Sequence, residues 1–100
     1  MPFTQIIELD GVKDEQALRQ HIATWEADEA GAAPGYVGSR LFADDEAPGR
    51  YLVAVDFSSR EEAEQNNARP ETAAWAATTR ALAGGEPAFR NLSEVYTTYR

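Results

Sequence analysis

The chain has 100 residues, and its 17 acidic side chains against nine lysines and arginines give a formal net charge of −8 at pH 7. This length fits a single domain over residues 1–100, and a hydrophobic content of 43% is too high for a disordered acidic segment. An acidic chain without a cluster of basic residues repels phosphate backbones and anionic lipids. Nucleic acid and membrane surfaces are therefore not expected as partners, which leaves small molecules and protein chains.

The sequence contains no cysteine and one histidine. Disulfides and cysteine nucleophiles are thereby excluded, and a protein-bound transition metal is not expected. The N-terminal segment has no basic region before its apolar residues and includes Glu8 and Asp10, unlike a secretory signal. No apolar run approaches the roughly 20 residues of a membrane helix. These features predict a soluble, cytoplasmic protein without a metal site.

The first half of the chain predicts a strand, a helix and a hairpin. Apolar and β-branched residues over 3–9 indicate a strand. Asp14 suits the N-cap of an amphipathic helix that would end at Gly31. The apolar positions of this helix recur at the spacing of one face: Leu18, Ile22 and Trp25. Strands are then expected at 36–42 and 50–57, joined by a loop that ends in a Pro-Gly turn.

The second half predicts a helix in two pieces and a last strand. The Ser-x-x-Glu motif at 59–62 is a capping box, which indicates a helix to about residue 67. Pro70 suits the first turn of a second helical segment that stops at the glycine pair 84–85. The stripe of that segment consists of Glu71, Trp75, Thr79 and Leu82. A final strand is expected over 88–97.

The order of these elements, β-α-β-β-α-β with the second helix broken in two, predicts an α+β ferredoxin-like fold with a four-stranded antiparallel sheet. In the strand at 51–57 both faces are largely apolar, since Val53 and Val55 point one way while Leu52 and Ala54 point the other. Two helices cover only one face of such a sheet. We therefore expect a second copy of the chain to cover the other face in a homodimer.

Three segments resemble the antibiotic biosynthesis monooxygenase-like family: PGRYLVAVDF at 48–57, SREEA at 59–63 and NARPET at 67–72. The family is a branch of the dimeric α/β-barrel proteins. The resemblance implies that barrel and, for the oxygenases of the family, a reaction without metal or flavin. In those enzymes an electron-rich aromatic substrate supplies the electrons to dioxygen. The family also contains quinol oxygenases, haem-degrading enzymes and members without an assigned reaction.

The resemblance implies two site residues in the broken helix. Asn66 stands where the family often has a histidine, and would hydrogen-bond an anionic substrate oxygen. The alternative is that Asn66 merely ends a short helix. Trp75 would correspond to the tryptophan of the haem-degrading branch and would shape the site, or it belongs to the core. The histidine that binds haem iron in that branch has no counterpart here, so haem degradation is not expected.

Further candidates come from their residue types. His21 is the one side chain that titrates near neutral pH, and is either a half-exposed surface histidine or a catalytic base. Aromatic residues that could form pocket walls are Trp25, Tyr51 and Phe57. Arg40 and Arg90 lie in expected strands, where we expect ion pairs with the acidic residues at 56 and 94, or else a clamp for an anionic ligand.

Together these features favour a cofactor-independent monooxygenase that acts on an aromatic or quinol-like small molecule. Asn66 would stabilise the substrate anion and Trp75 would shape the site. Two other hypotheses remain: a non-catalytic protein of the same fold that binds a small hydrophobic molecule, as in a stress response, and a structural dimerisation module without a pocket. The fold alone does not choose among them.

Overall fold

The computed structural model describes all 100 residues. Its elements follow in the order β1 (Phe3–Leu9), α1 (Glu15–Asp28), a short 3-10 helix η1 (Ala30–Ala32), β2 (Tyr36–Ala43), β3 (Tyr51–Phe57), α2 (Arg60–Asn67), α3 (Pro70–Leu82) and β4 (Ala88–Ser93). The strands form one antiparallel sheet in the order β2-β3-β1-β4. This arrangement confirms the expected ferredoxin-like fold, including the break in the second helix.

The helix starts follow from local side-chain chemistry. The Asp14 carboxylate accepts a hydrogen bond from the Ala17 amide at 3.0 Å, and the Ser59 hydroxyl oxygen accepts one from the Glu62 amide at 3.2 Å. Each cap satisfies an amide that has no partner within the helix. Pro70 occupies the first turn of α3, where its missing N–H costs nothing. Helix α1 ends at Asp28, before the expected stop at Gly31, because the chain tightens into η1.

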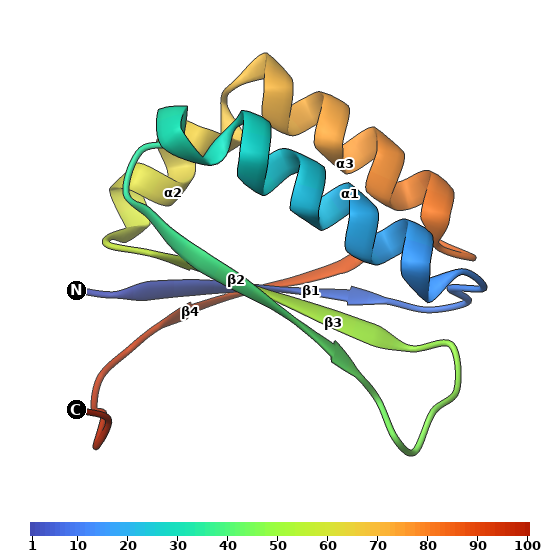
Figure 1. Ribbon diagram of the computed structural model, residues 1–100. Helices are drawn as coiled ribbons and strands as arrows, with labels where there is room; N and C mark the ends of the chain where they lie inside the picture. Colours follow the sequence, from blue (N-terminus) through green and yellow to red (C-terminus); the bar gives the residue numbers. More distant parts are fainter.

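The helices cover one face of the sheet and leave the other open (Figure 1). The side chains of β1 and β3 that point toward the helices form the main core together with Leu18 of α1. These buried strand residues include Ile7, Leu9 and Val53. A second cluster joins Phe3, Phe57 and Ala63 near the start of α2. The sheet thus forms the floor beneath α1 and α3.

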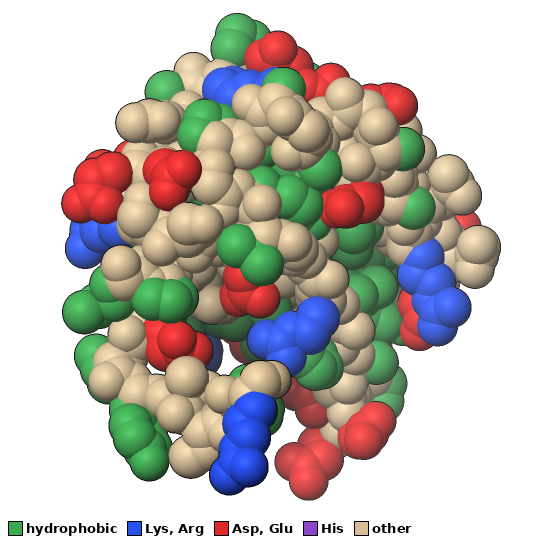
Figure 2. All heavy atoms as spheres, turned by 60° about the vertical axis from the view of Figure 1, so that its left-hand side comes forward, with side chains coloured by type: hydrophobic (Ala, Val, Ile, Leu, Met, Phe, Trp, Pro, Cys, Tyr) green, Lys and Arg blue, Asp and Glu red, His purple; other side chains and the backbone are tan.

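The opposite face of the sheet has no covering element (Figure 1). Strand pairing places Phe42 of β2 and Leu92 of β4 on this open face, where the two residues are 46% and 49% exposed. The tail after β4 and the β2–β3 loop project on this side (Figure 1). In Figure 2 basic and acidic side chains border the hollow at the lower edge, together with some hydrophobic ones. The expectation that the helices leave one face of the sheet uncovered is confirmed, and this face carries the charged Arg40 and Arg90 beside its apolar side chains. None of the helices has the length and apolar character to cross a membrane.

The last strand is shorter than expected, because it ends at Ser93 and not at residue 97. Strand β4 pairs only with β1, and the register ends where Phe3 meets Ser93. One further hydrogen bond joins the Glu94 amide to the Pro2 carbonyl at 2.9 Å. Beyond that point β1 offers no backbone to pair with, so residues 95–100 leave the sheet, and Tyr96 is 82% exposed.

Candidate functional site

A cavity of about 40 Å³ lies between the helices and the face of the sheet that they cover. It has room for a few water molecules, since one water needs about 10–15 Å³ on the same measure. Eight of its 13 lining residues are hydrophobic. The lining residues are Gln5, Ile7, Ile22, Trp25, Tyr36, Ser39, Val53, Val55, Phe57, Asn66, Asn67, Thr72 and Trp75. We call this cavity the pocket.

The pocket differs in charge from the rest of this acidic chain. Its walls contain no carboxylate and no basic side chain, and the phenol of Tyr36 is the one ionisable group among them. No group of three or more histidine, aspartate and glutamate side chains is arranged to hold a metal ion. A groove of about 360 Å³ between α1 and β2 lies next to the pocket, and Ile22 and Ser39 line both.

Asn66, in the last turn of α2, is 5% exposed and lines the pocket. Its side-chain oxygen Oδ1 accepts a hydrogen bond from Arg69 Nη1 at 3.2 Å, and the Thr72 hydroxyl oxygen lies 3.3 Å from it. A guanidinium only donates, so the atom beside it must be the amide oxygen. The amide nitrogen Nδ2 then has no partner within the protein, so Asn66 is a pocket-lining residue with a free N–H donor.

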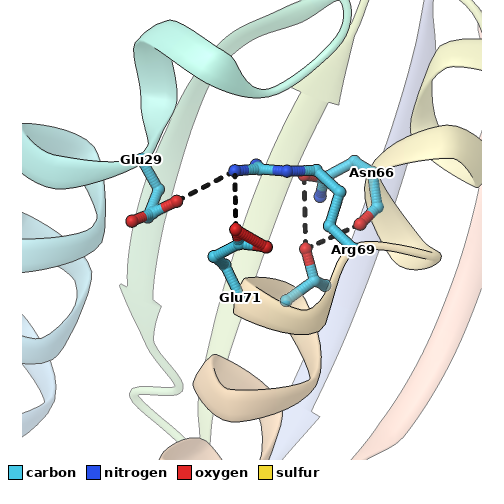
Figure 3. Close-up of polar contacts among 5 residues, drawn as sticks. Glu29, Asn66, Arg69 and Glu71 are labelled. Atoms are coloured by element: carbon cyan, nitrogen blue, oxygen red, sulfur yellow. Dashed lines mark hydrogen bonds and ion pairs between the residues drawn. The ribbon is translucent and has the colours of Figure 1, made fainter.

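Arg69 joins the end of α1 to the start of α3 (Figure 3). Its Nη2 lies 2.9 Å from Glu29 Oε1 and 3.8 Å from Glu71 Oε2. The Arg69 side chain is 17% exposed, so these ion pairs are largely shielded from solvent. The Thr72 hydroxyl donates to the Asn66 carbonyl oxygen at 2.6 Å and holds the turn between α2 and α3. The sequence analysis assigned no role to Arg69, Thr72 or Glu29.

Trp75 of α3 lies in the pocket wall, and its indole nitrogen Nε1 is buried without a hydrogen-bond partner. A buried donor left without a partner costs on the order of 1–3 kcal/mol. An acceptor atom of a bound ligand would remove that cost. Trp75 is therefore a second pocket-lining residue with an N–H donor that has no partner within the protein.

His21 of α1 stacks on Trp75, with ring centroids 4.9 Å apart and planes 17° apart. Its Nε2 lies 2.8 Å from the Thr79 hydroxyl oxygen, which itself donates to the Trp75 carbonyl at 2.8 Å. Because the hydroxyl has one hydrogen, His21 must be the donor to Thr79. Burial lowers the pKa of His21. His21 is half-buried behind Trp75 and does not line the pocket, so the structure does not place it as a base there.

Tyr36 lies at the centre of the aromatic part of the pocket wall, and it was not predicted from the sequence as a site residue. Its ring meets Trp25 edge-on at 4.8 Å and Phe57 at 6.1 Å. Its hydroxyl donates to Glu26 and lies 2.9 Å from Ser39 Oγ. Burial, together with the hydrogen bond to Glu26, raises the pKa of Tyr36 to about 12. Tyr36 is the first residue of β2 and pairs with Phe57 of β3. The expected hairpin of 36–42 and 50–57 was the sequence signal that could have placed Tyr36 beside Phe57.

The structure brings four of the predicted site residues to the pocket: Trp25, Phe57, Asn66 and Trp75. Tyr51 is not among the lining residues, and its hydroxyl instead donates to Glu15 at 3.0 Å. The expectation that Tyr51 forms a pocket wall is therefore wrong. Although Tyr51 faces the helices, it lies at the end of β3 where α1 begins.

Arg40 and Arg90 lie on the open face of the sheet, across the strands from Ala54 and Ile6. They cannot clamp a ligand in the pocket, which is on the opposite face. The expected ion pairs are also absent. Asp56 accepts a hydrogen bond from the Thr4 hydroxyl at 2.6 Å, and Arg40 lies 5.4 Å above the ring of Phe42. Glu94 lies beyond the end of β4 and forms no ion pair with Arg90.

No family model matches this sequence, and no curated protein matches it. Solved structures do match over nearly the whole chain. A mutant of SnoaB, a cofactor-independent oxygenase from Streptomyces nogalater, superposes with a TM-score of 0.82 at 15% identity, covering 99% of this chain and 98% of SnoaB. The chain has the fold of the antibiotic biosynthesis monooxygenases.

Two further structures support this fold assignment. A protein from Bordetella bronchiseptica named as an antibiotic biosynthesis monooxygenase has a TM-score of 0.78 at 18% identity, covering 95% of this chain and 98% of its own. Another of that name, from Caulobacter crescentus, has a TM-score of 0.76 at 18% identity, covering 95% and 91%. The resemblance to the antibiotic biosynthesis monooxygenases seen in the sequence is thus confirmed at the level of the fold.

Proposed function

We propose that this protein is a monooxygenase that oxidises an aromatic or quinol-like small molecule with dioxygen and without a bound cofactor. The observation that supports this proposal most is that two residues lining a pocket without charged side chains, Asn66 and Trp75, have N–H donors (Nδ2 and Nε1) without a partner in the protein. Hydrogen-bond donors in a pocket that holds little water stabilise an anion far better than they do in bulk water. The fold shared with a cofactor-independent oxygenase adds to this argument.

The absence of carboxylates from the wall fits the same chemistry. An enolate or phenolate would be repelled by a carboxylate at close range, and the chain as a whole has a net charge of −8. The acidic side chains nevertheless lie outside the pocket, and Tyr36 is held in its neutral form because its pKa is about 12. A neutral wall thus matches the charge of an anionic aromatic ring, and a ring larger than the few waters that the cavity holds would enter as side chains of the wall move apart.

For a substrate with a ring CH₂ group conjugated to a carbonyl through aromatic rings, as in an anthrone, the reaction balances without a cofactor. Loss of a proton from the CH₂ group to solvent gives the enolate. Its carbon forms a bond to dioxygen, and protonation gives a hydroperoxide. Loss of the remaining hydrogen on that carbon then breaks the O–O bond, which leaves a carbonyl on the carbon and releases water. The CH₂ group gives up four electrons and one dioxygen takes them. Asn66 and Trp75 would hold the developing oxyanion.

The test is oxygen uptake by the purified protein with dithranol, a dihydroxyanthrone, without added metal, flavin or nicotinamide. We expect uptake above the autoxidation rate and an anthraquinone product by mass spectrometry. Asn66→Ala should lower the catalysed rate about 100-fold, the usual loss for one oxyanion donor. Binding of dithranol without uptake would favour the ligand-binding hypothesis, and absence of both would leave dimerisation alone.

We further propose that the partner of this protein is a second copy of the same chain, bound to the open face of the sheet. The support is the apolar surface there, which includes Phe42 and Leu92, and its lack of any covering element. Light scattering should give twice the chain mass of 11.0 kDa. Leu92→Glu should reduce that mass to one chain, whereas Ala74→Glu on the exposed side of α3 should not. A single-chain mass for the unmodified protein at micromolar concentration would contradict the proposal.

A further inference from the structure

The turn between α2 and α3 contains a largely buried arginine that the proposed reaction does not use directly. Arg69 contacts Asn66, Glu29 and Glu71, and its side chain is 17% exposed (Figure 3). We propose that Arg69 is a positioning residue: it fixes the amide of Asn66 so that Nδ2, and not Oδ1, faces the pocket. This inference rests on the proposed function only for its catalytic consequence.

The two ends of an asparagine amide act oppositely on an anionic ligand, because the NH₂ group donates hydrogen bonds and the oxygen only accepts them. Rotation of the amide by about 180° exchanges an N–H donor for a carbonyl oxygen, and that oxygen would repel an enolate. Thr72 alone cannot prevent the rotation, because a hydroxyl accepts as readily as it donates. The guanidinium of Arg69 has donors only, so the rotated amide would set N–H against N–H. Of the two groups that contact Oδ1, Arg69 is the one that selects the productive orientation.

The guanidinium of Arg69 is also held by a second contact, through its other terminal nitrogen. Nη1 contacts the amide oxygen at 3.2 Å, while Nη2 contacts Glu29 at 2.9 Å. Glu29 follows the last residue of α1, so it anchors the guanidinium to a different helix from the one that bears Asn66. The planar fork of arginine reaches both partners at once with fixed geometry, whereas the single ammonium of lysine does not. We therefore expect that charge alone is insufficient at this position.

A double-mutant cycle on kcat for dithranol oxidation separates positioning from general stability. Arg69→Met should lower kcat about tenfold or more in the wild-type background, since small displacements of a catalytic group have costs of that size. In the Asn66→Ala background the same change should alter kcat less than twofold, because the group that Arg69 orients is gone. Equal factors in both backgrounds would overturn the inference.

Two further variants test whether the loss of kcat in Arg69→Met results only from a loss of stability. Arg69→Lys should restore the thermal stability lost in Arg69→Met, through its pair with Glu29, without restoring kcat. Full recovery of kcat by lysine would contradict the role of the fork. Arg80→Met removes an exposed arginine that pairs with Glu86 in the segment between α3 and β4, and it should leave kcat unchanged.

A structural measurement decides the inference even if the protein oxidises nothing. The side-chain NH₂ signals of Asn66 can be assigned by their loss in the Asn66→Ala NMR spectrum. In the wild-type protein these protons should show nuclear Overhauser contacts to pocket-lining side chains other than Thr72, and the contacts should persist in Arg80→Met. They should be lost in Arg69→Met or, if that variant does not fold, in Arg69→Lys. Unchanged contacts in the folded Arg69 variant would overturn the inference, whereas absent oxygen uptake would overturn the proposed function alone.

Discussion

The imidazole of His21 lies nearly parallel to the indole of Trp75, with 4.9 Å between the ring centroids. The two rings come from α1 and α3, so they join the two long helices directly above the sheet. Trp75 in turn forms part of the pocket wall. The environment of the one histidine is therefore coupled to the shape of the pocket.

This contact predicts a loss of stability in mildly acidic solution. Burial lowers the pKa of His21 in the folded protein, so the folded state binds fewer protons than the unfolded chain, whose histidine has a pKa of about 6.5. The free energy of unfolding should be at its full value above about pH 7.5 and fall as the pH drops through about 6.5. Urea unfolding at about pH 7.5 and 5.5 measures this change. His21→Gln should show a smaller decrease than the wild-type protein, and an equal decrease would contradict the prediction.

The unpartnered indole N–H predicts a binding effect that can be separated from packing. Trp75→Phe retains an aromatic ring but removes the donor at Nε1. We expect the affinity for 1-naphthol to fall about five- to tenfold, as for one lost hydrogen bond. The affinity for naphthalene, which offers no oxygen, should change much less. Isothermal titration with both ligands provides the comparison, and an equal loss for both would show that only packing matters.

The buried hydroxyl of Thr79 predicts a stability effect of definite size. It is 2% exposed and links His21 to the Trp75 carbonyl. Thr79→Val has nearly the same shape but leaves the His21 N–H and that carbonyl without this partner. The free energy of unfolding should fall by about 1–2 kcal/mol. Thr78→Val, at an exposed position on the same helix, should change it by less than about 0.5 kcal/mol.

The close approach of two glycines predicts a strong effect at Gly11. Its φ of +67° is in the left-handed region, and an added Cβ would lie 2.8 Å from the Gly84 Cα. Gly11→Ala should therefore lower the free energy of unfolding by about 2 kcal/mol or more. At Gly31 an added Cβ would meet nothing within 4 Å. Thermal unfolding of Gly11→Ala and Gly31→Ala should differ clearly, and similar melting temperatures would contradict the prediction.

The sequence predicted the elements well where local signals were strong. The caps at Asp14 and Ser59 and the proline at 70 marked the helix starts, and alternation marked β1 and β3. The end of β4 was missed because Tyr96 and its neighbours look like strand residues. Whether they pair depends on the length of β1, which their own sequence does not encode.

The site was predictable only in part. Asn66 and Trp75 were found through residue type and resemblance, and both line the pocket. Arg69 was not found, because its role depends on Glu29, which is 40 residues away in the chain. Tyr51 and Phe57 share a face of β3, yet only Phe57 reaches the pocket, since α1 covers the other end of the strand. Which residues of a strand reach the pocket depends on where the helices lie over the sheet.

The alternation along β3 lets two kinds of evolutionary change proceed separately. Val53, Val55 and Phe57 form the floor of the pocket, whereas Ala54 and Asp56 point to the opposite face. A substitution at an odd-numbered position of this strand alters what the pocket admits, and one at an even-numbered position alters the outer surface. Proteins with this fold can thus diverge in the lining of the pocket while the open face of the sheet stays the same, and the reverse.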